Sequence, residues 1–262
     1  MRYDGIDRIT PTRRPDATPL LHQNWHHLLF LHWEVPVNVL RPLVPEGLEL
    51  DLYDGKAYVG LIPFTISGVR PILMPPLPYL SNFHEVNVRT YVHLAGTDPG
   101  VWFFSLDASS TIAVAAARAA YKLPYYPASI EFSVEDLVPP RFRFHSTRQS
   151  DPGPASCNVE YEPGGTPSAA EPGTLEHFLV ERYILYAESD GRLYRARVHH
   201  APYPLQTANI LRLDDTTVWA AGIRHQEPPK LLHYASEVKV EVFPLEKLPS
   251  STPPQAPSQS RI

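Results

Sequence analysis

Strand-forming segments separated by tight-turn dipeptides constrain this chain more than any other feature. The dipeptide Asp-Gly, which favours two-residue hairpin turns, occurs at Asp54-Gly55 and Asp190-Gly191 between segments rich in β-branched and aromatic residues. A third pair of segments is joined by the five residues 96–100. The predicted hairpins pair 48–52 with 57–62, 86–94 with 101–106, and 182–187 with 193–200. Consecutive hairpins predict an antiparallel sheet or barrel, and the chain has no GxGxxG motif that would indicate a dinucleotide fold.

Two helices interrupt the predicted strands. Ser109 or Ser110 can cap an alanine-rich helix over 111–120, because a serine hydroxyl accepts a hydrogen bond from the first helical turn. Thr174 can cap a shorter helix through 175–178, without the full capping-box pair.

Proline and glycine cluster in three further segments. Residues 149–154 and 163–173 have the composition of ordinary surface loops. Residues 70–78 are unusually apolar for a loop. This third segment either packs on the outside of the barrel or forms a lid over a pocket.

Composition divides the 262 residues into three parts. We expect an N-terminal extension over 1–20, a single β domain over 21–248 and a disordered, Pro- and Ser-rich tail over 249–262. The middle part is long enough to bury a hydrophobic core without disulfides or a structural metal. The single cysteine, Cys157, excludes a disulfide framework and any cysteine-based zinc site.

Net charge and hydropathy indicate which classes of partner the chain can bind. The 23 basic and 28 acidic residues give a formal net charge of −5, so the chain lacks the basic footprint that nucleic acid requires. Its longest apolar stretch, 28–31, is far too short to span a bilayer, and residues 1–5 are no apolar signal segment. We therefore expect a cytoplasmic protein with neither nucleic-acid nor membrane partners.

Twelve histidines raise the question of a metal site. No HExxH or comparable spacing occurs. His26 and His32 share a strand face but lie about 20 Å apart at the rise of an extended strand. The neighbours His199 and His200 must point to opposite faces of their strand. We therefore predict no metal and no cofactor, with a metal site assembled from histidines of separate strands as the alternative.

One predicted strand carries a stripe of polar side chains. Alternation places Glu85, Asn87, Arg89, Tyr91 and His93 on one face, with apolar residues on the other. In antiparallel sheets such a stripe is more often a solvated outer face, and we favour that interpretation. In a closed barrel the same stripe could instead line an interior cavity.

Signs of a covalent nucleophile are weak. The chain has no GxSxG elbow, and Cys157 has no neighbour that would activate its thiol. Lysine is scarce, and no lysine has a second lysine beside it, as an activated Schiff-base lysine often has. The lysines are Lys56, Lys122, Lys230, Lys239 and Lys247.

Several short segments, spread from about residue 22 to 245, resemble segments of a known protein family. They are 32–33, 45–48, 60–64, 83–92, 117–118 with 123–126, 181–183 with 185–186, and 198–202. With them the chain resembles the uncharacterised bacterial YqjF-like family, which is grouped by similarity with the acetoacetate decarboxylase superfamily. The resemblance implies a mainly β fold, an antiparallel barrel or cone of the acetoacetate decarboxylase-like type with few short helices.

Two segments match the decarboxylase pattern itself. Phe83-His84-Glu85 resembles its aromatic-x-Glu strand, whose glutamate faces the active site. Residues 118–126 resemble the helix end that leads to Pro-Lys-Lys, but here Pro124 is followed by Tyr125-Tyr126. A phenol cannot form an imine and stays protonated near neutrality. Schiff-base decarboxylation is therefore disfavoured, and Lys122 would need a different backbone direction to take over the role.

The resemblance also implies roles for particular residues. Glu85 is a candidate general acid or base, the alternative being an ion pair with Arg89 or Arg118. Tyr125 or Tyr126 is a candidate donor to a carbonyl or oxyanion, since only one of two strand neighbours can point inward.

Further residues are candidates for binding the ligand. Arg118 could hold a ligand carboxylate, or it could be a helix-end cation. Arg89, Arg182 and His200 complete the predicted ligand-binding set, with a buried structural role as the alternative for Arg182, Tyr183 and His200.

These observations favour binding of a small anionic or carbonyl-bearing molecule in the barrel, with or without lysine-independent catalysis. A ligand-binding or sensor protein that lost the nucleophile is the alternative, and a filled barrel with a structural role is a third. The expected partner is a small molecule, and a homo-oligomer is left open.

Overall fold

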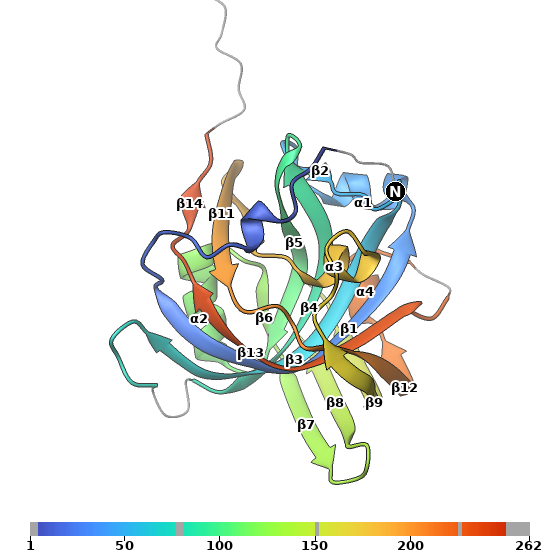
Figure 1. Cartoon of the computed structure of the whole chain (residues 1–262). Helices are drawn as coiled ribbons and strands as arrows, with labels where there is room; N and C mark the ends of the chain where they lie inside the picture. The colour runs from blue at the N-terminus through green and yellow to red at the C-terminus, as the bar shows by residue number, and fades with distance from the viewer. Residues whose placement is uncertain (1–4, 77–80, 150–151, 225–226, 250–262) are drawn as a thin grey trace, which may run out of the picture.

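The computed structural model describes residues 5–76, 81–149, 152–224 and 227–249, and within these ranges fourteen strands form one continuous sheet (Figure 1). The strands are β1 (Leu21–Val35), β2 (Glu49–Leu50), β3 (Ala57–Pro71), β4 (Phe83–Leu94), β5 (Thr97–Ala108), β6 (Tyr125–Pro127), β7 (Ser129–Glu135), β8 (Arg141–Arg148), β9 (Ala155–Ser168), β10 (Ile184–Ser189), β11 (Arg192–His199), β12 (Leu205–Asp215), β13 (Leu231–Val242) and β14 (Glu246–Lys247). The α-helices are α1 (Val37–Leu40), α2 (Thr111–Tyr121), α3 (Leu175–Val180) and α4 (Thr217–Ala220), with 3-10 turns at Thr10–Thr12 and Arg41–Leu43. The expected mainly β fold with few short helices is confirmed.

The sheet closes into a ring. The ring runs through β1, β3, β4, β5, β10, β11 and β13 and returns to β1. Its pairings are antiparallel except between β5 and β10, where Leu185 lies opposite Val101 in parallel register. The last pairing brings Val198 of β11 opposite Val242 of β13. Beyond β13 the sheet continues as β12, β9, β8 and β7, and the β7–β8 hairpin projects below the ring in Figure 1.

The Asp-Gly dipeptides form the predicted tight turns. In both, the two central residues have positive φ angles, 48° and 79° at Asp54-Gly55 and 54° and 67° at Asp190-Gly191, as the type I′ turn requires. The second turn joins β10 to β11 as predicted. The first is closed by reciprocal backbone hydrogen bonds of 3.0 Å between Tyr53 and Lys56. The strand before it, β2, pairs with β4 rather than β3, so the predicted pairing of 48–52 with 57–62 is wrong.

The predicted five-residue loop over 96–100 is also wrong. The chain turns at Ala95-Gly96, whose φ angles are 48° and 79°, and Thr97 already lies opposite Leu94. The residues up to Gly100 continue β5 because they extend its ladder with β4 as far as Val92. Ala95 hides this turn from the sequence, since a non-glycine residue seldom adopts the left-handed conformation.

Both predicted helices are confirmed. The hydroxyl of Ser110 accepts a hydrogen bond from the backbone N–H of Ala113 at 3.2 Å and caps α2. Thr174 caps α3 in the same way, accepting from His177 N–H at 3.2 Å. Helix α2 ends at Tyr121 and is followed by Lys122, which adopts the left-handed conformation with φ 57°.

The proline- and glycine-rich segments differ from one another. Residues 163–168 are no loop, because they belong to β9 and pair with β12. Parts of these segments lie outside the described residues, namely 77–78 and 150–151. The predicted tail also lies outside them from residue 250 to residue 262. In the apolar segment 70–78, the side chain of Leu73 is fully exposed and that of Met74 is half exposed, so Leu73 does not pack on the outside of the barrel.

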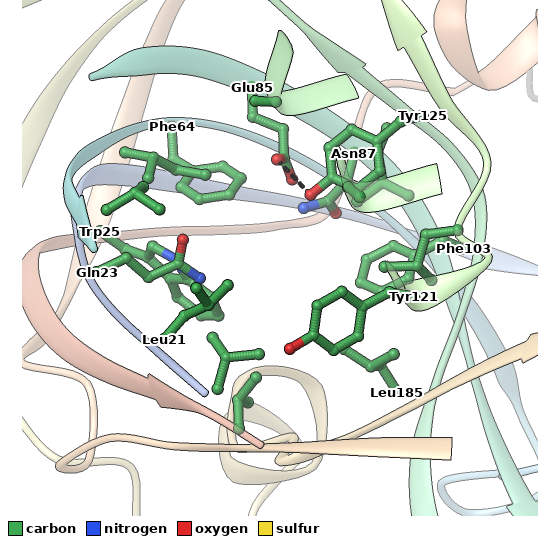
Figure 2. Close-up of a pocket in the computed structure, with 18 of the residues that line it drawn as sticks. Leu21, Gln23, Trp25, Phe64, Glu85, Asn87, Phe103, Tyr121, Tyr125 and Leu185 are labelled. Carbon is green, nitrogen blue, oxygen red and sulfur yellow. Dashed lines mark hydrogen bonds between the residues drawn. The ribbon is translucent and has the colours of Figure 1, made fainter. Parts of the chain in front are cut away.

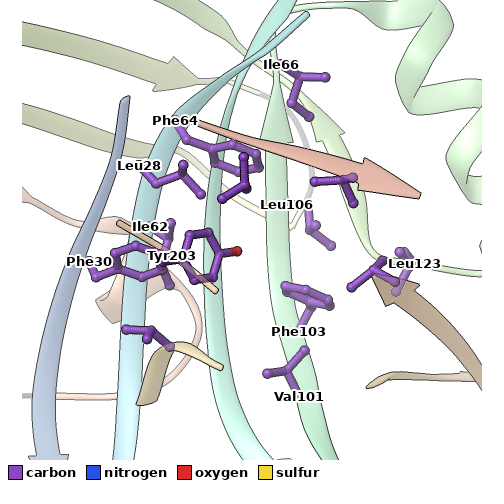
Figure 3. Packing of buried hydrophobic residues seen from close by; sticks show 14 of the residues in the cluster. Leu28, Phe30, Ile62, Phe64, Ile66, Val101, Phe103, Leu106, Leu123 and Tyr203 are labelled. Atoms are coloured by element: carbon purple, nitrogen blue, oxygen red, sulfur yellow. The ribbon is translucent and has the colours of Figure 1, made fainter. Parts of the chain in front are cut away.

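Two apolar clusters support the ring. One fills part of its interior, and Figure 3 shows the side chains of Leu28, Phe64, Phe103 and Leu106 facing one another across it. The other lies on the outer side of the strands and includes Val86 and Val88 of β4. No described helix is long and apolar enough to cross a membrane.

Ring closure predicts a steric test at Gly100. A Cβ atom placed there would lie 2.5 Å from the backbone oxygen of Ile184, where β10 joins β5. Gly100→Ala should therefore reduce the free energy of unfolding by about 1–3 kcal/mol, measured by urea denaturation. Gly164→Ala is the matched control, because its Cβ would meet mainly the rotatable Thr207 hydroxyl at 3.0 Å. Equal losses in the two variants would contradict this account of the closure.

Candidate functional site

The interior of the ring holds a cavity of about 430 Å³ (Figure 2). Its wall is mostly apolar, and α2 contributes Ala113, Ala116, Ala117 and Ala120 to it. These positions share one face of the helix, and their small side chains leave the space open. The polar and charged residues in the wall are Gln23, Ser81, Glu85, Asn87, Arg89, Tyr121, Tyr125, Arg182 and Tyr203.

Strand β4 supplies the main polar stripe of this wall. Glu85, Asn87 and Arg89 are 2%, 4% and 8% exposed and line the cavity, while the alternate residues Val86 and Val88 pack on the outer side. The favoured interpretation of this stripe as a solvated outer face is therefore wrong. The reason is ring closure, which turns one face of β4 away from solvent.

The rest of the stripe is also buried. Tyr91 donates a hydrogen bond from its hydroxyl to the carbonyl oxygen of Leu179 at 2.8 Å, and His32 Nε2 lies 2.6 Å from the same hydroxyl. His93 accepts a hydrogen bond from Gly96 N–H at 3.0 Å and supports the β4–β5 turn. These two residues hold the end of the ring together and are not part of the cavity wall.

Glu85 and Tyr125 form a hydrogen-bonded pair in the cavity. The Tyr125 hydroxyl donates to Glu85 Oε2 at 2.8 Å, as the dashed line in Figure 2 shows. Tyr125 is the first residue of β6, which pairs in parallel with β5 and places Tyr125 opposite Leu106. The predicted alternation of Tyr125 and Tyr126 is observed, because Tyr126 is absent from the described cavity wall. The Tyr126 ring instead contacts two guanidinium groups, those of Arg118 and Arg148.

Burial dominates the electrostatics of this pair. It raises the pKa of Glu85 to about 7, and the hydrogen bonds from Tyr125 and Asn87 lower the pKa in part. Glu85 forms no salt bridge with any described cation, so the alternative of an ion pair with Arg89 or Arg118 is not observed. Burial also raises the pKa of Tyr125 well above its usual value, so its hydroxyl remains a donor at neutral pH.

The predicted arginines lie in different surroundings. Arg89 faces the cavity and donates from Nη2 to the Leu179 carbonyl oxygen at 3.0 Å. Arg182 reaches the cavity wall but is held by Asp51, with Nη1 and Oδ2 2.6 Å apart. Arg118 is exposed on α2 and donates from Nε to the backbone oxygen of Tyr125 at 2.6 Å. It lies outside the cavity wall, as the helix-end alternative expects.

His200 lies next to the cavity, packed between aromatic rings. Its ring stacks on Tyr183 at a centroid distance of 4.5 Å and contacts Tyr203 at the same distance. Burial lowers the pKa of His200 to about 4, so the imidazole is neutral. The cavity wall does not include it, which fits the alternative of a buried core residue.

No lysine is among the residues that line the described cavity. Lys122, the one lysine near Tyr125, is exposed at the left-handed end of α2. The described residues also contain no cluster of three or more side chains that could hold a metal ion. What the cavity offers is acid–base and hydrogen-bonding chemistry from Glu85, Asn87 and Tyr125.

Sequence reasoning missed four polar residues of the wall. Gln23 lies outside the predicted hairpins, Ser81 follows the apolar segment 70–78, and Tyr121 comes directly after the predicted alanine-rich helix. Tyr203 follows a proline in a segment with no strand periodicity. Of these, only Tyr121 carried a usable signal, because it continues the helical spacing from Ala113 and Ala117.

Comparison with known protein families gives a match over most of the chain. The model of the family DUF2071, described as an uncharacterized conserved protein, matches residues 22–239. The uncharacterized protein YqjF of Bacillus subtilis (strain 168) is 38% identical over 234 residues, which cover 89% of this chain and 94% of that protein.

Solved structures show the same fold at much lower sequence identity. Acetoacetate decarboxylase from Legionella pneumophila has a TM-score of 0.62 at 12% identity, covering 90% of this chain and 89% of that one. The enduracididine biosynthesis enzyme MppR, solved in complex with pyruvate, has a TM-score of 0.61 at 12% identity, covering 90% and 93%. The fold is therefore that of acetoacetate decarboxylase-like enzymes, as the resemblance implied.

The raised pKa of Glu85 predicts a pH dependence of stability. In the unfolded chain this carboxyl loses its proton near 4.5, and in the folded protein it does so at about 7. The folded state therefore binds the extra proton between these values, and stability falls as the pH rises through 7. From pH 5 to pH 8 the free energy of unfolding should fall by about 2–3 kcal/mol more in the wild type than in Glu85→Gln.

Urea denaturation at several pH values measures this difference. Asp107, whose pKa burial raises to about 6, titrates in both proteins, so the comparison removes its contribution apart from the repulsion between Asp107 and Glu85. Parallel pH profiles for the two proteins would show that Glu85 titrates normally.

Proposed function

The chain belongs to the DUF2071 family of conserved proteins, and we propose that it binds a small carbonyl- or carboxyl-bearing molecule inside the barrel and uses Glu85 as a general acid or base. The observation that carries this proposal is the Glu85–Tyr125 pair in a mostly apolar cavity. A mostly apolar site strengthens each hydrogen bond that a ligand oxygen makes there.

The two protonation states of Glu85 give the pair its chemistry. With a pKa of about 7, the carboxyl group is available both as acid and as base at neutral pH, which is where general catalysis is most efficient. In its protonated form Glu85 donates a proton to a ligand oxygen. In its ionised form it accepts a hydrogen bond from the Tyr125 hydroxyl, or it removes a proton from a carbon next to a carbonyl.

Other features of the site agree with a lysine-independent reaction. The described cavity wall contains no lysine, so a covalent imine is not part of the proposal. The pyruvate named with MppR is itself a small carbonyl acid, which supports the proposed ligand class. We include Arg89 in the site but leave out Tyr126, Arg118 and His200, because their side chains do not line the cavity.

A second candidate is a ligand-binding or sensor protein without turnover. The absence of a lysine from the described wall favours it, since the decarboxylase-type nucleophile is replaced while a cavity remains. The third interpretation, a filled barrel with a structural role, is disfavoured by the cavity of about 430 Å³.

A binding and turnover screen tests the proposal. We expect at least one compound among small keto, hydroxy and aromatic acids and neutral ketones to raise the melting temperature, because a ligand that binds only the folded state stabilises it. Any stabilising compound is then incubated with the protein and followed by NMR for product. Glu85→Gln should keep binding within about tenfold and reduce turnover at least about 100-fold.

The control is Glu188→Gln, which changes an exposed glutamate on β10 and should alter neither binding nor turnover. Binding without product in the wild type would favour the second candidate. No stabilisation by any compound in the panel would contradict the proposed ligand class.

A further inference from the structure

We propose that the ligand of this cavity is an elongated acid with two polar ends. Arg89 holds its carboxylate, Glu85 and Tyr125 hold a carbonyl or hydroxyl oxygen at the other end, and an apolar segment lies between. This inference rests on the proposed function, since it names the ligand class of the same cavity.

The first argument is an unpaired buried charge. Arg89 is more than nine-tenths buried and lines the cavity, yet it forms no salt bridge with any described carboxylate. Its Nε has no hydrogen-bond partner. The two other buried arginines of the described chain are both paired at 2.6 Å, Arg148 with Asp107 and Arg182 with Asp51. An unpaired buried cation is costly, and a ligand carboxylate would supply the missing partner in bidentate geometry.

The second argument is the charge balance around Arg89. Asp51 is shared by two arginines, because Arg8 donates to it together with Arg182. Glu181 is engaged by the Tyr183 hydroxyl at 2.5 Å and the Tyr203 N–H at 3.0 Å, and does not pair with Arg89. Neither carboxylate therefore offsets the positive charge of Arg89, which is left in excess among the described residues beside it.

The neighbouring histidines do not offset this excess. Burial lowers the pKa of His32 well below its usual value and that of His200 to about 4, and the charge of Arg89 lowers both further. Both imidazoles are therefore neutral and contribute no charge at this end of the cavity. This end of the cavity is therefore complementary to an anionic group of a ligand.

The third argument is the spacing of the two ends. Glu85 and Arg89 lie on the same face of β4, four residues apart, which corresponds to about 13 Å along an extended strand. Between them β4 contributes Asn87, and the wall on either side of Asn87 is apolar, with Ile62 of β3 and Leu106 of β5 opposite it (Figure 3). A short acid such as pyruvate would reach one end only, whereas a longer acid would contact both and cover the apolar wall.

A set of linear compounds tests this inference by titration calorimetry on the wild-type protein. The oxo-acids 4-oxopentanoate, 6-oxoheptanoate and 8-oxononanoate vary the separation of the two ends. The ketone 2-nonanone and the acid nonanoate each keep one end of the longest compound. We expect affinity to change with chain length and the best oxo-acid to bind at least about tenfold more tightly than either one-ended compound.

Two variants assign the carboxylate to its partner. Arg89→Gln should weaken binding of the best oxo-acid by at least about tenfold and leave 2-nonanone unchanged. Arg89→Lys should recover part of the loss, because it restores the charge without the bidentate fork. Arg212→Gln, an exposed arginine on β12, is the control and should behave as wild type. The length series on the wild type decides the question even where Arg89→Gln fails to fold.

The outcomes separate this inference from the proposed function. If 2-nonanone binds as tightly as the oxo-acids, or if Arg89→Gln binds them like the wild type, the two-ended ligand is wrong while a carbonyl pocket stands. If nonanoate equals the best oxo-acid, the second end at Glu85 is wrong. If none of these compounds and none of the earlier panel binds, the proposed function itself fails.

Discussion

Closure of the sheet is the constraint on which the site depends. The pairings of β5 with β10 and of β11 with β13 complete the ring, and they turn the inner face of β4 away from water. Glu85 then loses solvation and its pKa rises to about 7, whereas Arg89 is buried without a described carboxylate beside it. Ring closure thus creates a carboxyl group of raised pKa at one end of the cavity and a cation without a described carboxylate partner at the other.

The local part of the fold could be predicted from the sequence. The Asp190-Gly191 turn and the Ser110 cap are determined by neighbouring residues, and both were found. The turn at Ala95-Gly96 was missed because its first residue carries no signal for a left-handed conformation. The face of β4 that points inward could not be decided, since it depends on strands about a hundred residues or more away in the sequence.

The candidate site was predictable to the extent that alternation determines it. Alternation put Glu85 and Arg89 on one face and required that only one of Tyr125 and Tyr126 point inward. The rotation of α2 about its axis is set by packing, so the outward position of Arg118 was not determined by the sequence pattern. The same rotation turns an alanine face toward the interior, and this small-residue face keeps the cavity open.

The central claim is that the two ends of this cavity are complementary to one ligand. A crystal structure of the protein soaked with the tightest-binding oxo-acid of the length series tests it most directly. The account predicts the compound inside the ring, with its carboxylate on the Arg89 guanidinium and its ketone oxygen within hydrogen-bond distance of Glu85 or Tyr125. A ligand bound in the reverse direction, or bound only outside the ring, would contradict the account.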